Sequence, residues 1–341
     1  MTSHFKAAIA GVTGYTGREL LRLICEHPLA DLTEVYGHSK AGMSLFELYP
    51  EYDGFTDNVE ILPLDKLKES TADILFIALP HGTAAEKVAA AIEGGYSGKI
   101  IDLSADFRIH DPERYEATYN RSHPCSYLLK DFVYGLTELD QDRLKGADYV
   151  ANPGCFATAL QLLTAPVAEA GYTEHIAITG LTGSTGSGNK PSATTHHPER
   201  YGNLKAYKVL EHRHLAEARQ RLDRLDNAPE ILFTPVSAPF DRGIWMTATF
   251  SITNIKDIAQ IYQDAFGDAP LIRLKETLPQ LREVVDSPLS ILGVQTSGDH
   301  AVAGIAIDNL LKGAASQAIQ NMNLMLNFNQ ELGLERPPRL I

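Results

Sequence analysis

A glycine-rich turn between an apolar strand and a helix constrains the fold of this chain most strongly. Residues 6–10 are typical of a short buried strand, and Gly11, Gly14 and Gly17 follow it directly. Apolar side chains then recur at helical spacing until the chain reaches Pro28. Glycines between a strand and a helix allow a tight turn and let backbone N–H groups approach a pyrophosphate. The pattern therefore predicts the first unit of a dinucleotide-binding sheet.

The alternation of strands and helices continues over the first 105 residues. Apolar strands are expected at 32–36, 73–79 and 99–103, with an alanine-rich helix over 82–93. Such alternation predicts an α/β fold with a parallel, doubly wound sheet.

The second half of the chain has a different pattern. A helix is expected to open at Cys155, another over 212–225, and a last one over about 310–328. Between them the sequence predicts these strands: 176–181, 231–236, 244–252, 291–294 and 302–307. The pattern favours a mainly antiparallel sheet with helices on one face. Residues 182–207 are predicted to form a long loop, of a length that is usually functional or mobile.

Composition excludes several classes of protein. The chain has 341 residues, which suggests two domains, and its 44% hydrophobic and 21% charged residues are typical of a globular protein. A net charge of −13 disfavours a nucleic-acid partner. Its 3 cysteines suit neither a disulfide framework nor a zinc site. Without an apolar run of membrane length or a signal peptide, we expect no membrane association and a cytoplasmic protein.

The residues around the turn indicate which dinucleotide binds. We expect the pyrophosphate to contact the turn, at Gly11, Thr13, Gly14, Tyr15, Thr16 and Gly17. Ser39 and Lys40 follow the second strand, where an acidic residue would bind the ribose 2′-hydroxyl of NAD. A hydroxyl and an ammonium group favour a 2′-phosphate instead, so the sequence predicts NADP(H). Glu34 would be the ribose ligand if the strand ended earlier.

One cysteine has the sequence context of a nucleophile. Asn152, Pro153 and Gly154 force a turn, which places Cys155 in the first turn of the next helix. The helix dipole and free N–H groups stabilise a thiolate there. Cys25 and Cys125 lack this context and are expected to be inert.

A cysteine nucleophile needs an acid/base partner, and His212 and His214 are the candidates. The alternative for this pair is a solvated start of a helix. His196 and His197 have no second ligand pair at metal-site spacing, so we interpret them as loop residues and expect no metal.

Six segments in order resemble the N-acetyl-γ-glutamyl-phosphate reductase family, and the resemblance extends from about residue 8 to residue 334. They are GVTGYTG at 11–17, LSADFR at 103–108, VYGLTEL at 133–139, NPGC at 152–155, HRH at 212–214 and AIDNLLKGAA at 306–315.

The resemblance implies a Rossmann domain at 1–151, completed by residues 309–341, and an α+β domain like that of glyceraldehyde-3-phosphate dehydrogenase at 152–308. It implies NADPH-dependent reduction of N-acetylglutamyl 5-phosphate through a Cys155 thioester, in arginine biosynthesis. His214 or His212 would be the acid/base, with His214 preferred. The substrate would be bound by Arg108 at its phosphate, by Arg213 at its carboxylate, and by Asn152, Ser184 and Lys190. Asn309 would lie near the nicotinamide.

This chain departs from the family pattern in three places. Phe-Ala-Thr follows Cys155 where Tyr-Pro-Thr is typical, the 183–190 loop differs, and Leu-Ala-Glu follows His214 in place of Thr-Pro-Glu. The departures leave the acyl group open, and a related carrier-bound aminoadipyl-phosphate reductase of lysine biosynthesis is one alternative. Aspartate-semialdehyde dehydrogenase and a non-catalytic NADP sensor are the others. The family precedent implies a homodimer or homotetramer.

Overall fold

The computed structural model describes residues 4–252 and 257–338. The chain forms two compact units. The first contains residues 1–153 and 314–335, and the second contains residues 154–313 and 336–341. The ends of the expected domains at 1–3 and 339–341 lie outside the described residues.

The first unit is built on a parallel sheet, as the alternation of strands and helices predicts. All of its described strand pairings are parallel. The strands in spatial order are β3 (Ile61–Pro63), β2 (Ala30–Gly37), β1 (Phe5–Ala10), β4 (Ile74–Ile77), β5 (Lys99–Asp102), β7 (Tyr149–Ala151) and β6 (Phe132–Tyr134). β4 is buried along its whole length, because helices cover both faces of such a sheet.

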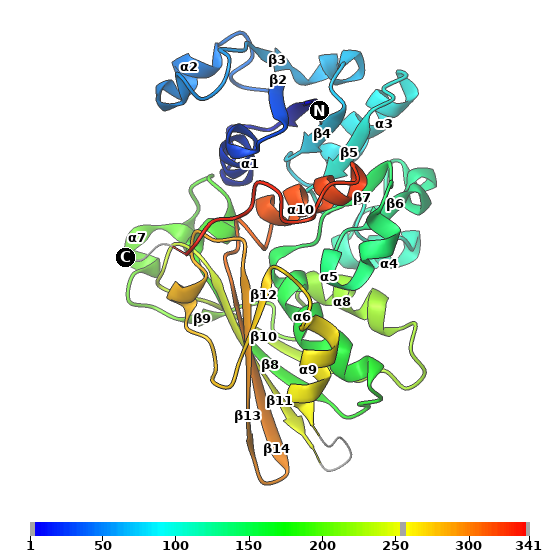
Figure 1. The fold of residues 1–341 in the computed structure, drawn as a ribbon, viewed down its shortest axis with the longest axis vertical. Helices are drawn as coiled ribbons and strands as arrows, with labels where there is room; N and C mark the ends of the chain where they lie inside the picture. Colours follow the sequence, from blue (N-terminus) through cyan, green and yellow to red (C-terminus); the bar gives the residue numbers. More distant parts are fainter. Residues whose placement is uncertain (1–3, 253–256, 339–341) are drawn as a thin grey trace. The chain divides into compact units, whose positions relative to one another are not determined.

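Helices lie on both faces of this sheet (Figure 1). α3 (Ala84–Glu93) packs its buried alanines and Val88 on side chains of β1, β4 and β5. α1 (Tyr15–Glu26) packs on β1 and β2 and also against α10 (Ala315–Met325), which returns from the end of the chain. The remaining helices of the unit are α2 (Leu45–Leu48), α4 (Pro112–Tyr119) and α5 (Thr137–Leu144).

The glycine turn lies where the strand order reverses, between the neighbours β1 and β4. Ligands of open α/β sheets bind at the carboxyl ends of the strands at such a point. Gly11 has a φ of +97°, and its N–H donates to the Tyr36 carbonyl at 2.8 Å. The turn therefore lies beside the carboxyl end of β2.

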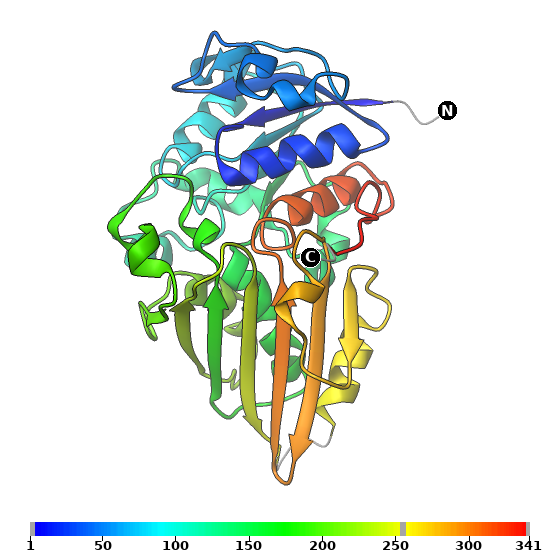
Figure 2. The ribbon, with the colours of Figure 1, turned by 90° about the vertical axis from the view of Figure 1, so that its left-hand side faces the viewer.

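The second unit has a mixed sheet that Figure 2 shows as a row of long strands. Its order is β12 (Ile272–Lys275), β13 (Ser290–Ser297), β14 (His300–Ile307), β11 (Ile244–Ser251), β8 (Ile176–Thr182), β10 (Ile231–Ser237) and β9 (Lys205–Ala206). Helices α6 (Cys155–Glu169), α8 (His214–Leu222) and α9 (Ile258–Phe266) lie along one side of it (Figure 1). α6 is apolar and buried from Phe156 to Ala168, so it forms the centre of the core.

The sheet differs from the sequence prediction in detail. Four pairings are antiparallel, as expected, but β8 pairs with β10 and β12 pairs with β13 in parallel. The predicted 182–207 loop contains short elements, among them α7 (His197–Arg200) and β9. The sequence did not predict strands β9 and β12. They contain only two and four residues, which is too short for an alternation of apolar and polar side chains to be recognised.

The last helix begins later than its apolar spacing predicts, at Ala315 and not near 310. The Asp308 carboxylate accepts hydrogen bonds from the backbone N–H groups of Leu310 and Leu311, at 2.8 and 3.0 Å. Gly313 N–H then donates to the Asp308 carbonyl at 2.9 Å. These bonds fold 308–313 into a turn, so the helix cannot extend through it.

Gly17 tests the role of the glycine turn in stability. A Cβ at Gly17 would lie 2.2 Å from the Gly11 carbonyl oxygen. We expect Gly17→Ala to lower the free energy of unfolding in urea by about 1–3 kcal/mol, because backbone atoms would have to shift. Gly14→Ala is the matched control, since its Cβ would meet nothing closer than 3.6 Å. Equal transitions for the two variants would contradict this account.

Candidate active site

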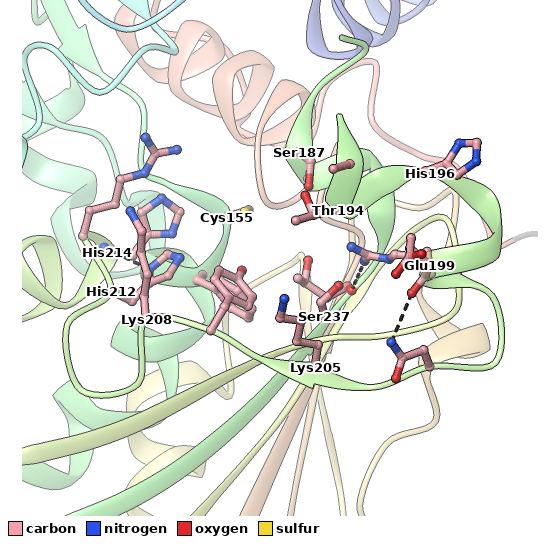
Figure 3. A pocket seen from close by; sticks show the side chains of 18 residues that line it. Cys155, Ser187, Thr194, His196, Glu199, Lys205, Lys208, His212, His214 and Ser237 are labelled. Carbon is pink, nitrogen blue, oxygen red and sulfur yellow. Dashed lines mark hydrogen bonds between the residues drawn. The ribbon is translucent and has the colours of Figure 1, made fainter. Parts of the chain in front are cut away.

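A cavity of about 830 Å³ lies in the second unit (Figure 3). Cys155 and Phe156 line it from the start of α6, and His212, Arg213 and His214 line it where the chain enters α8. Further lining residues come from the 186–208 stretch. Cys155 and the two histidines, which are 57 or more residues apart in sequence, therefore face one space.

Cys155 is the first residue of α6, in the position that the Asn-Pro-Gly turn predicts. Gly154 is the N-cap and has no side chain to satisfy the N–H groups of the first turn. An anion at this end of a helix is stabilised by those groups and by the helix dipole. Gly313 packs close by, because a Cβ there would lie 2.8 Å from the Cys155 Cβ.

The other two cysteines lie in the first unit, in surroundings that favour the thiol. Burial raises the pKa of Cys25 to about 11, and burial also raises the pKa of Cys125. Both therefore have less thiolate than an unperturbed cysteine at neutral pH.

The two histidines have different surroundings. His212 packs against Phe156, Phe233 and Tyr207, with ring centroids between 5.4 and 5.8 Å apart. Burial, followed by the Arg213 and Lys208 cations, lowers the pKa of His212 to about 4. Its Nδ1 atom accepts the backbone N–H of His214 at 3.2 Å. His212 is therefore a neutral imidazole that helps to hold the start of α8.

His214 lies beside a carboxylate that the sequence analysis missed. Its Nε2 atom is 3.9 Å from Oε1 of Glu217, and the other carboxylate oxygen of Glu217 accepts the Gly154 N–H at 2.9 Å. Glu217 is 1% exposed. The sequence feature that could have indicated this contact is the spacing between His214 and Glu217. Residues three positions apart on a helix lie on the same face, about one turn from each other.

The cavity also contains more cations than expected. Besides Arg213, the lining includes Arg200, Lys205 and Lys208, whereas Glu199 is the only acidic side chain among its described residues. Tyr207 lines it too, and burial together with the nearby Cys155 raises the pKa of Tyr207 to about 12. The phenol therefore stays protonated, and the cavity suits an anionic ligand.

Two predicted substrate residues do not line this cavity and lie in the first unit. Arg108 is buried, and its Nε and Nη2 atoms donate to the carbonyls of Asn152 and Leu103, both at 2.8 Å. The Asn152 side chain donates to the Ala314 carbonyl and accepts from Asn321, both at 3.0 Å. These contacts fix the backbone just before Cys155.

Three further predicted residues lie in the second unit. Ser184 and Lys190 are not part of the cavity lining, although their neighbours Gly186 and Ser187 are. Asn309 is buried and joins two loops, accepting the Gly243 N–H at 2.6 Å and donating to Thr185 Oγ1 at 3.0 Å.

The predicted cofactor residues lie around the glycine turn of the first unit. The first turn of α1 has neither a side-chain cap nor an acidic residue, which suits an anionic ligand. Ser39 and Lys40 are exposed just after β2. Glu34, the alternative ribose ligand, accepts hydrogen bonds from Tyr36, Ser70 and Thr71 at 2.5 to 2.9 Å. Its carboxylate is therefore already satisfied.

Within residues 4–252 and 257–338, no group of three His, Cys, Asp or Glu side chains is arranged to hold a metal ion. No helix in these ranges is long and apolar enough to cross a membrane.

Comparison with known proteins agrees with this architecture. Residues 6–147 match the semialdehyde dehydrogenase NAD-binding domain, and residues 155–309 match the semialdehyde dehydrogenase dimerisation domain. Among solved structures, aspartate semialdehyde dehydrogenase II from Vibrio cholerae has a TM-score of 0.73 at 17% identity. That match covers 95% of this chain and 99% of the other, and at this identity it shows the fold alone.

Curated relatives are more similar in sequence. The N-acetyl-gamma-glutamyl-phosphate reductase of Archaeoglobus fulgidus is 36% identical, over 98% of this chain and 99% of that protein. The enzyme of the same name from Methanopyrus kandleri is 39% identical, over 96% and 97% of the two chains. The chain therefore belongs to the N-acetyl-gamma-glutamyl-phosphate reductase family.

Proposed function

We propose that this protein reduces N-acetyl-L-glutamyl 5-phosphate to N-acetyl-L-glutamate 5-semialdehyde and phosphate, with NADPH, as a step of arginine biosynthesis. The observation that supports this most directly is Cys155 at the start of α6, facing a cation-rich cavity with His214. An acyl phosphate is an anionic electrophile, so it needs both a thiolate and positive charge. Membership of the family supports the choice of acyl group.

The first chemical step uses the sulfur of Cys155. The thiolate attacks the carbonyl carbon of the acyl phosphate and forms a C–S bond. The tetrahedral oxyanion collapses, the bond between carbon and the phosphate oxygen breaks, and phosphate leaves with the electron pair. A thioester remains on Cys155. The basic side chains around the cavity, Arg213 among them, would bind the anionic parts of the substrate.

Residues of the glycine turn fit the expected cofactor, because α1 begins with an uncapped N-terminus and Ser39 and Lys40 lie just beyond β2. When bound, NADPH supplies the hydride that reduces a thioester. His214 would protonate the forming hydroxyl group and take that proton back as the C–S bond breaks and the semialdehyde leaves. The Glu217 carboxylate would stabilise the imidazolium form.

We assign Arg108, Asn152 and Asn309 positioning roles and not direct ligand contacts, because their side chains already bind other groups of the protein. We keep Ser184 and Lys190 as proposed substrate ligands. Because neither residue lines the cavity, their contact with the substrate would form only when substrate binds. The match to a dimerisation domain supports a homo-oligomer. We also propose that the protein is located in the cytoplasm.

The reverse reaction tests the function. N-acetylglutamate semialdehyde, phosphate and NADP should give NADPH, measured by its absorbance, and the rate should depend on phosphate. Cys155→Ser should fall to background because serine lacks a thiolate population, while Cys25→Ser and Cys125→Ser keep most of the activity. Equal or faster turnover of aspartate semialdehyde would contradict the proposed substrate. Full activity in Cys155→Ser would exclude the thioester.

The histidine pair separates acid/base catalysis from packing. His214→Asn should lower kcat about 10²–10⁴-fold, the usual range for a lost general acid/base. His212→Asn should lower it far less and should instead reduce the melting temperature, because His212 supports the aromatic packing and the start of α8. The opposite ranking of kcat values would assign the proton transfer to His212.

Ser39 and Lys40 test the cofactor preference. Replacing both by alanine should raise the KM for NADP about tenfold to hundredfold, because a charge-assisted contact to the 2′-phosphate contributes about 1.5–3 kcal/mol. The KM for NAD should hardly change, since NAD has no such phosphate. Comparable increases in both KM values would show that these residues only shape the turn. A wild-type preference for NAD would also overturn the assignment.

A further inference from the structure

Arg200 is a cation in the cavity to which neither the motifs nor the proposed chemistry gives a specific contact. It is the last residue of α7 and lines the same cavity as Cys155. Its Nε atom donates to the Ala238 carbonyl and its Nη2 atom donates to the Thr182 carbonyl, both at 2.9 Å. Thr182 is the last residue of β8 and Ala238 directly follows β10, so the ends of two sheet strands fix the plane of the guanidinium group.

The two backbone bonds use only part of the guanidinium group. Within the described part of the chain, Arg200 forms no ion pair, and its Nη1 atom donates no hydrogen bond. Burial lowers the pKa of Arg200, but an arginine keeps its charge at neutral pH. Nη1 and the second hydrogen of Nη2 form a fixed fork that matches the two oxygens of a carboxylate.

Arg200 and the nucleophile belong to one site. Tyr207 lines the same cavity, and both the Cys155 thiol and the Arg200 cation affect the pKa of its phenol. Figure 3 shows Glu199, the neighbour of Arg200, across the cavity from His212 and His214, with Cys155 in between. Arg200 is the next residue of α7 and lines this cavity together with Cys155 and His214.

The other cations are less suited to select a carboxylate. Arg213, Lys205 and Lys208 are exposed, whereas Arg200 is partly buried. An exposed side chain must be ordered on binding and is screened by water, which weakens its contribution. A side chain that is already fixed loses little entropy when it binds.

We propose that Arg200 binds the α-carboxylate of the substrate and makes this group a requirement for efficient turnover. The inference rests on the proposed function. It assigns the substrate carboxylate to Arg200 in place of Arg213, the residue that the sequence analysis favoured. Arg213 then remains available for the phosphate.

Kinetics of the reverse reaction with two substrates test this proposal. One is N-acetylglutamate semialdehyde, and the other is the same aldehyde with its α-carboxylate replaced by a carboxamide. The wild type should prefer the carboxylate by about tenfold to hundredfold in KM, the usual size of a charge-assisted contact. Arg200→Gln should abolish this preference by raising the KM of the carboxylate substrate. Its kcat and its KM values for NADP and phosphate should stay near those of the wild type.

Three variants give the controls. Arg200→Lys keeps the charge without the fork and should restore part of the preference. Arg224→Gln, an exposed arginine of the same unit outside the cavity lining, should behave as the wild type. Loss of the preference in Arg213→Gln but not in Arg200→Gln would overturn the proposal, as would an effect of Arg200→Gln confined to the KM of phosphate.

Calorimetric titration with N-acetylglutamate separates this inference from the proposed function, because it needs no turnover. Binding should be about tenfold or more weaker in Arg200→Gln than in the wild type, while circular dichroism shows both to be folded. Equal affinities, or no binding by the wild type, would overturn the carboxylate site. Absence of turnover with intact, Arg200-dependent binding would instead refute only the proposed reaction.

Discussion

The hydrogen bond between the Gly154 N–H and the Glu217 carboxylate joins the beginnings of α6 and α8. It determines the geometry of the site, because Cys155 follows Gly154 directly and His214 precedes Glu217 by one helical turn. Both partners are buried, so breaking the bond would leave a buried polar group unsatisfied. The same carboxylate lies 3.9 Å from the His214 imidazole, so one side chain supports both the proposed nucleophile and the proposed acid/base.

The segments that resemble the family have two kinds of task. NPGC and HRH place groups at the cavity, whereas LSADFR and DNLLKG hold the backbone around them. Arg108 of LSADFR is an example of the second kind, since it is buried and bonded within the first unit. NPGC has both kinds of task, because the Asn152 side chain is buried and bonded within the first unit whereas Cys155 lines the cavity. A motif that is specific for a family therefore does not by itself identify a ligand contact, and buried hydrogen bonds decide between the two.

The surroundings of the histidines separate two residues that look equivalent in the sequence. His212 lies among aromatic rings and close to two cations, and both conditions disfavour its protonated form. His214 faces a carboxylate, which favours a protonated intermediate. The proposal that His214 transfers the proton and that His212 serves in packing depends on these environments and not on the order of the residues.

The sequence by itself determined the parallel sheet, the glycine turn beside β2, the start of α6 at Cys155 and the family. Each of these depends on periodicity, turn residues or motifs, which are properties of residues close together in the chain. Only the tertiary structure decided that Glu34 is satisfied by Ser70 and Thr71, that Glu217 bonds Gly154, and that Arg200 is held at the cavity. The partners of Arg200 are 18 and 38 residues away, and Gly154 is 63 residues from Glu217. No local pattern encodes such contacts, because they depend on how strands and helices pack, and that packing selects which charged side chains face the cavity.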